Sequence, residues 1–116
     1  MTNKSFSVEV SSGFTAFHSH DKSLNEPAHN HNFKYTITLK GPLNDEGYLV
    51  DFREIEELLK QISKGLESKN LNTIIPVPTT ENLAYYIFCK VKKVFPQACK
   101  IQLKEKENYQ AVYEEV

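Results

Sequence analysis

The histidines are the residues of this chain whose type and spacing point most directly to chemistry. All four lie between positions 18 and 31 of the 116 residues. His29 and His31 are two residues apart in an alternating segment, so both leave the same face of a strand, and a hairpin would lay His18 beside them. Three neutral imidazoles with an open fourth position are typical of catalytic zinc. An isolated pair would more often be a coincidence of the surface, but the third histidine favours a zinc site.

A zinc ion held in this way would polarise a carbonyl group or lower the pKa of a bound water. His20 repeats the two-residue spacing with His18 and suits three roles: a fourth ligand, a proton carrier or a loop residue near the metal. Because a functional histidine needs an identifiable partner, we favour the loop interpretation slightly. The predicted metal set therefore consists of His18, His29 and His31.

Glu105 is the second candidate for chemistry, because it follows Ile101 and Leu103 at strand spacing and so falls on the apolar face. A carboxylate buried there is costly unless donors pair with it. Two adjacent N–H groups, such as those on the 2-amino-pyrimidinone edge of a pterin or guanine, would be a bidentate partner. A strand end that reaches solvent explains the position equally well, since charged residues are mostly exposed.

Alternation of apolar and polar residues indicates the strands that must position these groups. A first strand is expected over 6–16, with a bend or bulge across 11–13, and a second over 31–39. Two more are expected at 101–103 and around 111–113.

Two segments with apolar residues at helical spacing separate these pairs of strands. The first begins at Asp51, a candidate cap, and is expected to stop at Gly65. The second is capped by Thr79 or Thr80 and closes at Pro96. The side chains expected to face inward are Phe52, Ile55, Leu58, Leu59 and Ile62 in the first helix and Leu83, Ala84, Ile87, Phe88, Val91 and Val94 in the second.

The order β-β-α-α-β-β predicts a single α+β domain over 1–116, with two helices on one face of a four-stranded antiparallel sheet. A formal net charge of -1 argues against nucleic acid as a partner. No apolar run approaches the roughly 20 residues that cross a bilayer, so a cytoplasmic protein is expected. Cys89 and Cys99 are expected to be buried, reduced side chains. The two sheet edges favour a homo-oligomer.

Five short segments also stand in an order that one family shares. They are Phe14-Thr15-Ala16-Phe17-His18, which is similar to F-x-A-x-H; His29-Asn30-His31-Asn32-Phe33, to H-G-H-x-Y/F; Gly47-Tyr48-Leu49-Val50-Asp51-Phe52, to G-x-x-x-D-F; Pro78-Thr79-Thr80-Glu81-Asn82-Leu83-Ala84, to P-T-x-E-N-L-A; and Leu103-Lys104-Glu105, to a strand ending in glutamate. Through them the chain resembles the 6-pyruvoyl-tetrahydropterin synthase and 6-carboxytetrahydropterin synthase family. Each motif is weak alone, but five in the same order are strong.

The resemblance implies the tunnelling fold (T-fold) and a lyase that acts on 7,8-dihydroneopterin triphosphate. It also implies homohexamers in which subunit sheets join into barrels and active sites lie between subunits. Zinc would coordinate the side chain of the substrate while a base removes a proton. The residues that the resemblance assigns are His18, His29 and His31 to the metal and Glu105, Thr79 and Thr80 to the pterin.

The chain departs from the family pattern at its acid and base residues. The family's cysteine before H-G-H is missing from 22–28, and Glu26 stands three residues before His29 instead. This resembles variants that cleave the side chain to a 6-hydroxymethylpterin, and a glutamate near zinc can act as a general base. An exposed loop carboxylate is an equal alternative. Ser68 replaces the family's relay histidine, and a hydroxyl is a poor proton acceptor near neutral pH.

Three functions therefore stand in order of preference. The first is a pterin lyase with Glu26 as the base, in which His20 substitutes for the missing relay. The second is a catalytically silent protein that binds zinc and a pterin or purine. The third is a structural metal site without a small ligand.

Overall fold

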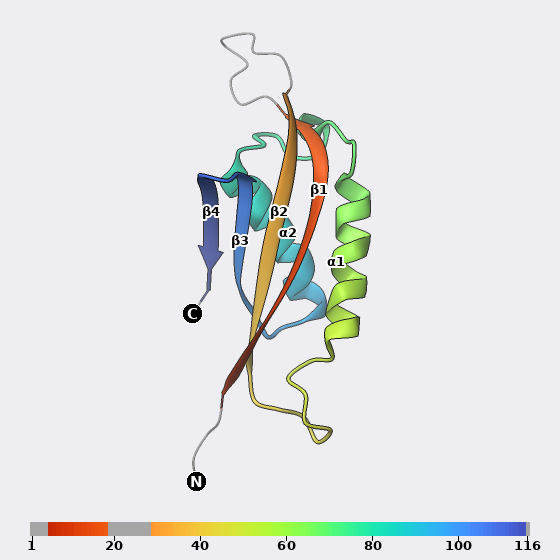
Figure 1. The fold of residues 1–116 in the computed structure, drawn as a ribbon, viewed down its shortest axis with the longest axis vertical. Helices are drawn as coiled ribbons and strands as arrows, with labels where there is room; N and C mark the ends of the chain where they lie inside the picture. The colour runs from red at the N-terminus through yellow and green to blue at the C-terminus, as the bar shows by residue number, and fades with distance from the viewer. Residues whose placement is uncertain (1–4, 19–28, 116) are drawn as a thin grey trace.

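A four-stranded sheet and two helices form the computed structural model, which describes residues 5–18 and 29–115 except for the side chains of His18, His29 and Asn30. The strands are β1 (Phe6–His18), β2 (His29–Gly41), β3 (Ala98–Lys106) and β4 (Tyr109–Glu114). The helices are α1 (Phe52–Leu66) and α2 (Thr80–Val94), with a 3₁₀ helix η2 (Leu71–Thr73) between them. The strands lie in the order β1-β2-β3-β4, all antiparallel, and both helices cover one face (Figure 1). The predicted α+β architecture is confirmed.

The hairpin of β1 and β2 is longer and more regular than predicted. Its register runs without a shift from Phe6 opposite Gly41 to His18 opposite His29, so no bulge interrupts 11–13. The reason lies at Gly13, where an added Cβ would come 2.7 Å from the backbone oxygen of Phe33. Glycine therefore lets the two strands approach closely instead of marking a bulge.

Helix α1 begins as predicted but ends later. The carboxylate of Asp51 accepts a hydrogen bond from the backbone N–H of Arg53 at 2.9 Å and so caps the first turn. The expected stop at Gly65 is wrong, because the helix continues to Leu66, which is buried in the core. The left-handed residue that follows is Ser68, with φ of 59°.

Helix α2 shows which of two candidate threonines is the cap. Thr79 Oγ1 accepts from the backbone N–H of Asn82 at 3.1 Å, and Thr80 is the first helical residue. Three expectations of burial are wrong: Phe52 and Val94 are half exposed, and Cys89 is exposed. Phe52 and Val94 are the terminal residues of their helices. Cys89 follows buried Phe88, and one residue turns a helix by about 100°, away from the sheet.

A buried chain of hydroxyl groups fixes α1 against the hairpin. Tyr35 of β2 donates to the backbone oxygen of Leu59 at 3.0 Å, and its hydroxyl lies 2.7 Å from Ser63 Oγ. Ser63 Oγ in turn lies 2.8 Å from Ser12 Oγ of β1. Burial raises the pKa of Tyr35 above its ordinary value. These bonds set the rotation of α1 and direct the segment after it toward β1.

Candidate functional site

The end of the β1–β2 hairpin carries the predicted metal ligands. The register places His18 opposite His29, and His31 opposite Ala16. The side chain of His31 is 14% exposed and lies on the face that the helices cover, as does buried Ala16. The backbone thus brings the three predicted ligands within two positions of one another along the ladder. Within the side chains that the structure describes, no three His, Cys, Asp or Glu groups converge, so the zinc site stays a prediction.

Glu105 lies near the end of β3 on the same covered face, as strand spacing predicted. Its side chain is 10% exposed, and His31 Nε2 lies 3.3 Å from its Oε1. Thr80 Oγ1 donates to its Oε2 at 2.6 Å, and Thr80 is the first residue of α2, where the helix dipole favours a negative charge. The alternative of a strand end reaching solvent is excluded. Each oxygen of a carboxylate has a second lone pair with which it can accept a bond from a ligand.

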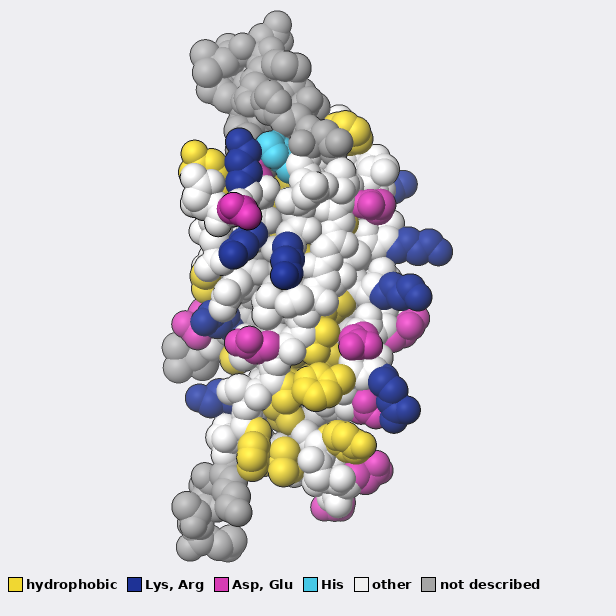
Figure 2. Space-filling model, in the orientation of Figure 1, with side chains coloured by type: hydrophobic (Ala, Val, Ile, Leu, Met, Phe, Trp, Pro, Cys, Tyr) yellow, Lys and Arg dark blue, Asp and Glu magenta, His cyan; other side chains and the backbone are white. Residues whose placement is uncertain are grey.

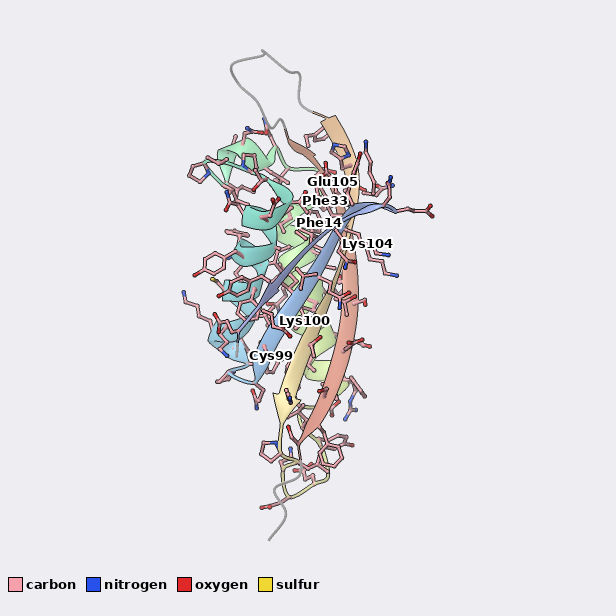
Figure 3. The ribbon with its side chains drawn as sticks, turned by 90° about the vertical axis from the view of Figure 1, so that its left-hand side faces the viewer. Phe14, Phe33, Cys99, Lys100, Lys104 and Glu105 are labelled. Atoms are coloured by element: carbon pink, nitrogen blue, oxygen red, sulfur yellow. The ribbon has the colours of Figure 1, made fainter. Side chains whose placement is uncertain are left out.

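The cavity at this end of the sheet has a volume of about 530 Å³. Its lining residues are His31, Asn32, Lys34, Lys104, Glu105, Lys106 and Glu107. Phe33 stacks on Phe14 with ring centres 5.1 Å apart, and both lie near Glu105 (Figure 3). The His31 ring meets Phe33 edge-on at 6.0 Å, so an aromatic pair supports the polar groups of the site. A larger hollow of about 850 Å³ lies at the start of α1, but it is lined by no histidine. The smaller cavity is therefore the candidate site.

The segment after α1 holds the end of β1 in place. The Glu67 carboxylate accepts the backbone N–H of Thr15 at 2.5 Å, and the N–H of Ser68 donates to the Thr15 oxygen at 2.6 Å. The N–H of Phe17 donates to the oxygen of Lys69 at 2.9 Å. Ser68, which the resemblance places where the family has a relay histidine, is thus tied to β1 three residues before the predicted zinc ligand His18.

The remaining predicted residues differ in how far the structure describes them. Thr80 reaches Glu105, whereas the hydroxyl of Thr79 caps α2. Glu26 and His20 lie outside the described residues. Sequence reasoning missed the bond from Glu67 to β1, although Glu67 directly precedes Ser68 in the sequence.

The sequence matches the family model for 6-pyruvoyl tetrahydropterin synthase over residues 7–116. The chain is 32% identical over 77 residues to a dihydroneopterin monophosphate aldolase of Pyrococcus furiosus, a match that covers 66% of this chain and 67% of the relative. The protein therefore belongs to the 6-pyruvoyl tetrahydropterin synthase family.

Solved structures show the same fold. The 6-pyruvoyl tetrahydropterin synthase of Caenorhabditis elegans has a TM-score of 0.86 at 21% identity, with all of both chains covered. That of Plasmodium vivax, in a mutant whose catalytic glutamate is replaced by cysteine, has a TM-score of 0.81 at 15% identity over 97% of this chain and 99% of the other. The tunnelling fold predicted from the motifs is thus confirmed. Among the described helices, none has the length and apolar character to cross a membrane.

Proposed function

We propose that this protein is a zinc-dependent lyase that acts on a phosphorylated dihydroneopterin, 7,8-dihydroneopterin triphosphate being the predicted substrate. Glu105 carries the proposal: its carboxylate is nearly buried, is held by Thr80 and shares a cavity with His31. Burying such a charge is costly unless strong donors complete it. In a member of a pterin synthase family, the two adjacent N–H groups of a pterin ring are the donors that match it best.

The two threonines at the start of α2 would assist in different ways. Thr80 fixes the direction of the Glu105 carboxylate through a hydrogen bond that a bound ring does not need to break. Thr79 accepts a bond from the helix, but a hydroxyl can donate its own hydrogen at the same time. Thr79 can therefore contact an acceptor atom of the ring while it caps the helix.

His18, His29 and His31 would hold the zinc ion. The strand register supports this fit, because it sets His18 opposite His29 and leaves His31 two residues farther along β2. Neutral imidazole is also a preferred zinc ligand. Bound zinc would polarise the oxygen atoms of the substrate's side chain. His31 lies beside Glu105, so the same cavity would hold the pterin ring and place its side chain near the zinc ion.

Glu26 would act as the base, since it stands three residues before His29 and no cysteine occupies 22–28. The Plasmodium vivax protein is a precedent within the family for a catalytic glutamate. In a cleavage of the aldol type, the carboxylate takes the proton of a side-chain hydroxyl and a carbonyl forms there. The adjacent carbon–carbon bond breaks, and a proton is returned to the carbon that stays on the ring. A carboxylate whose pKa suits the step can do this work.

Product analysis tests the proposal directly. The purified protein is assayed for zinc and then incubated with dihydroneopterin triphosphate or monophosphate, and the products are identified by mass. We expect about one zinc per chain and a pterin with a shortened or altered side chain. Glu26→Ala should abolish turnover, whereas Glu46→Ala, an exposed carboxylate at the far end of the sheet, should not. Unchanged substrate at high enzyme concentration would overturn the lyase function.

A silent binding protein is the second candidate, and Ser68 is the observation that favours it. The structure ties this serine to Thr15 at the edge of β1, in the position where the family pattern has a relay histidine. Pterin binding that depends on Glu105 but leads to no product would support this candidate. Zinc without any affinity for a pterin would leave a structural metal site.

Assembly and location are also proposals. A homohexamer would pair exposed strand edges between copies, and β4 is an edge strand of the described sheet. Light scattering of the purified protein measures the number of subunits, and a monomer would contradict the hexamer. A cytoplasmic location is tested by cell fractionation.

A further inference from the structure

The uncovered face of the sheet carries a row of residues with an unbalanced positive charge. The register aligns Gly13 of β1, Lys34 of β2, Lys104 of β3 and Gln110 of β4 across the sheet. Both lysines are exposed and alternate with buried neighbours, and Lys104 lies on the side away from the helices (Figure 3). Figure 2 shows basic side chains gathered on this face near a histidine, with acidic side chains interspersed.

Lys34 and Lys104 lie directly opposite each other, which is an unfavourable arrangement for like charges. Facing residues have Cβ atoms about 4.5–5.5 Å apart, and like charges directly opposite each other destabilise a sheet. No described carboxylate forms an ion pair with either lysine. Lys100, farther down the same face, instead lies opposite Glu114. The lysine pair is therefore a local charge that an anion would stabilise.

The position of the pair connects it with the candidate site. The ladder between β2 and β3 ends at Lys34 and Lys104, whereas β2 extends to His29 and β3 to Lys106. The cavity lies at this end of the ladder, and both lysines line it together with His31 and Glu105. Lys104 is the neighbour of Glu105 in sequence and points to the opposite face. A ligand anchored at Glu105 could thus extend its side chain past the end of the ladder to the lysines.

We propose that Lys34 and Lys104 form an anion subsite that binds the phosphate ester on the side chain of the pterin substrate. This inference rests on the proposed function. It adds the residues that would make a phosphorylated pterin bind more tightly than a free one. A phosphate monoester carries a charge of about -1.5 to -2 near pH 7, which matches two lysines. Lys106 and Glu107 also line the cavity, but their opposite charges largely cancel. The preference for a phosphorylated ligand therefore depends on Lys34 and Lys104.

Binding measurements on matched ligands test the subsite. The affinities of 7,8-dihydroneopterin, its monophosphate and its triphosphate are measured for the wild type and for Lys34→Gln, Lys104→Gln and Lys100→Gln. We expect the phosphorylated pterins to bind at least about tenfold more tightly than the free pterin, a preference that decreases with salt. Each of the first two variants should lose most of this preference without weakening the free pterin, and Lys100→Gln should keep it. The monophosphate and triphosphate arms show whether one phosphate is sufficient.

The outcomes separate this inference from the function on which it rests. Equal binding of free and phosphorylated pterin, or a full preference in the Lys34 and Lys104 variants, would overturn the subsite and leave the pterin function standing. If no pterin binds, the function fails, and inorganic tripolyphosphate then tests the lysines alone. Tripolyphosphate binding that is lost in both lysine variants supports the subsite. No binding to the wild type, or unchanged binding in the variants, overturns it.

Discussion

Replacing Glu105 with glutamine changes little in the shape of the candidate site but removes one of its two acceptors. The carboxylate presents two acceptor oxygens, whereas the amide presents one acceptor and one donor. Two adjacent N–H groups of a pterin would meet two acceptors in the wild type, and one of them would face an N–H₂ group in Glu105→Gln. Hydrogen bonds to charged groups contribute about 1.5–3 kcal/mol each, so we expect a loss of roughly 2–4 kcal/mol, or about 30- to 1,000-fold in affinity.

The fold should tolerate the same change. Thr80 can still donate to the amide oxygen of the new side chain, so the bond to Oε2 becomes weaker but is not lost. The cost of burying a charge disappears at the same time, since the side chain is only 10% exposed. We therefore expect the free energy of unfolding to change by no more than about 1 kcal/mol. A large loss of stability would show that Glu105 has a structural role.

The assay is a titration with a fluorescent pterin, supported by calorimetry. The chain contains no tryptophan, so indole emission does not interfere with the signal. Glu107→Gln is the matched control, because it removes an exposed carboxylate from the wall of the same cavity. Glu105 is not the pterin anchor if folded Glu105→Gln binds the pterin as tightly as the wild type, or if Glu107→Gln loses the same affinity.

Three further predictions concern the structure around the site. Thr79→Ala removes the N-cap of α2 and should lower the free energy of unfolding by about 1 kcal/mol, seen as a lower midpoint in chemical denaturation; an unchanged midpoint would contradict the cap. Tyr35→Phe deletes a buried hydroxyl with two partners and should cost about 1–3 kcal/mol by the same measurement, more than the loss of an exposed hydroxyl. Tyr113 donates a hydrogen bond to the Glu115 carboxylate, which raises the pKa of Tyr113 to about 12. This hydrogen bond therefore stabilises the fold fully below about pH 10, and the stabilisation is lost as the pH rises through 12. Glu115→Gln should let Tyr113 ionise at lower pH, measured by phenolate absorbance against Tyr113→Phe, and an unshifted titration would exclude this cause.

Local patterns in the sequence were sufficient to predict the helices and strands and much of the site's composition. Alternation, helical period and capping residues are local properties, so the strands around His31 and Leu103 and the helix starts at Asp51 and at Thr79 or Thr80 could be predicted from them. The same alternation placed Glu105 on the apolar face, and the order of five motifs indicated the family. Helix ends were less predictable, because α1 continues through Gly65 while its neighbour Leu66 is packed in the core.

Which side chains meet depends on tertiary packing and could not be predicted from local patterns. Thr79 and Thr80 are equivalent in the sequence, but Thr79 keeps an extended backbone at the N-cap while Thr80 is the first helical residue, so one hydroxyl caps α2 and the other binds Glu105. The opposition of Lys34 and Lys104 depends on the register between strands that are about 70 residues apart in the chain. Sequence periodicity describes one element at a time, whereas pairing across the sheet is set by how all the elements pack together.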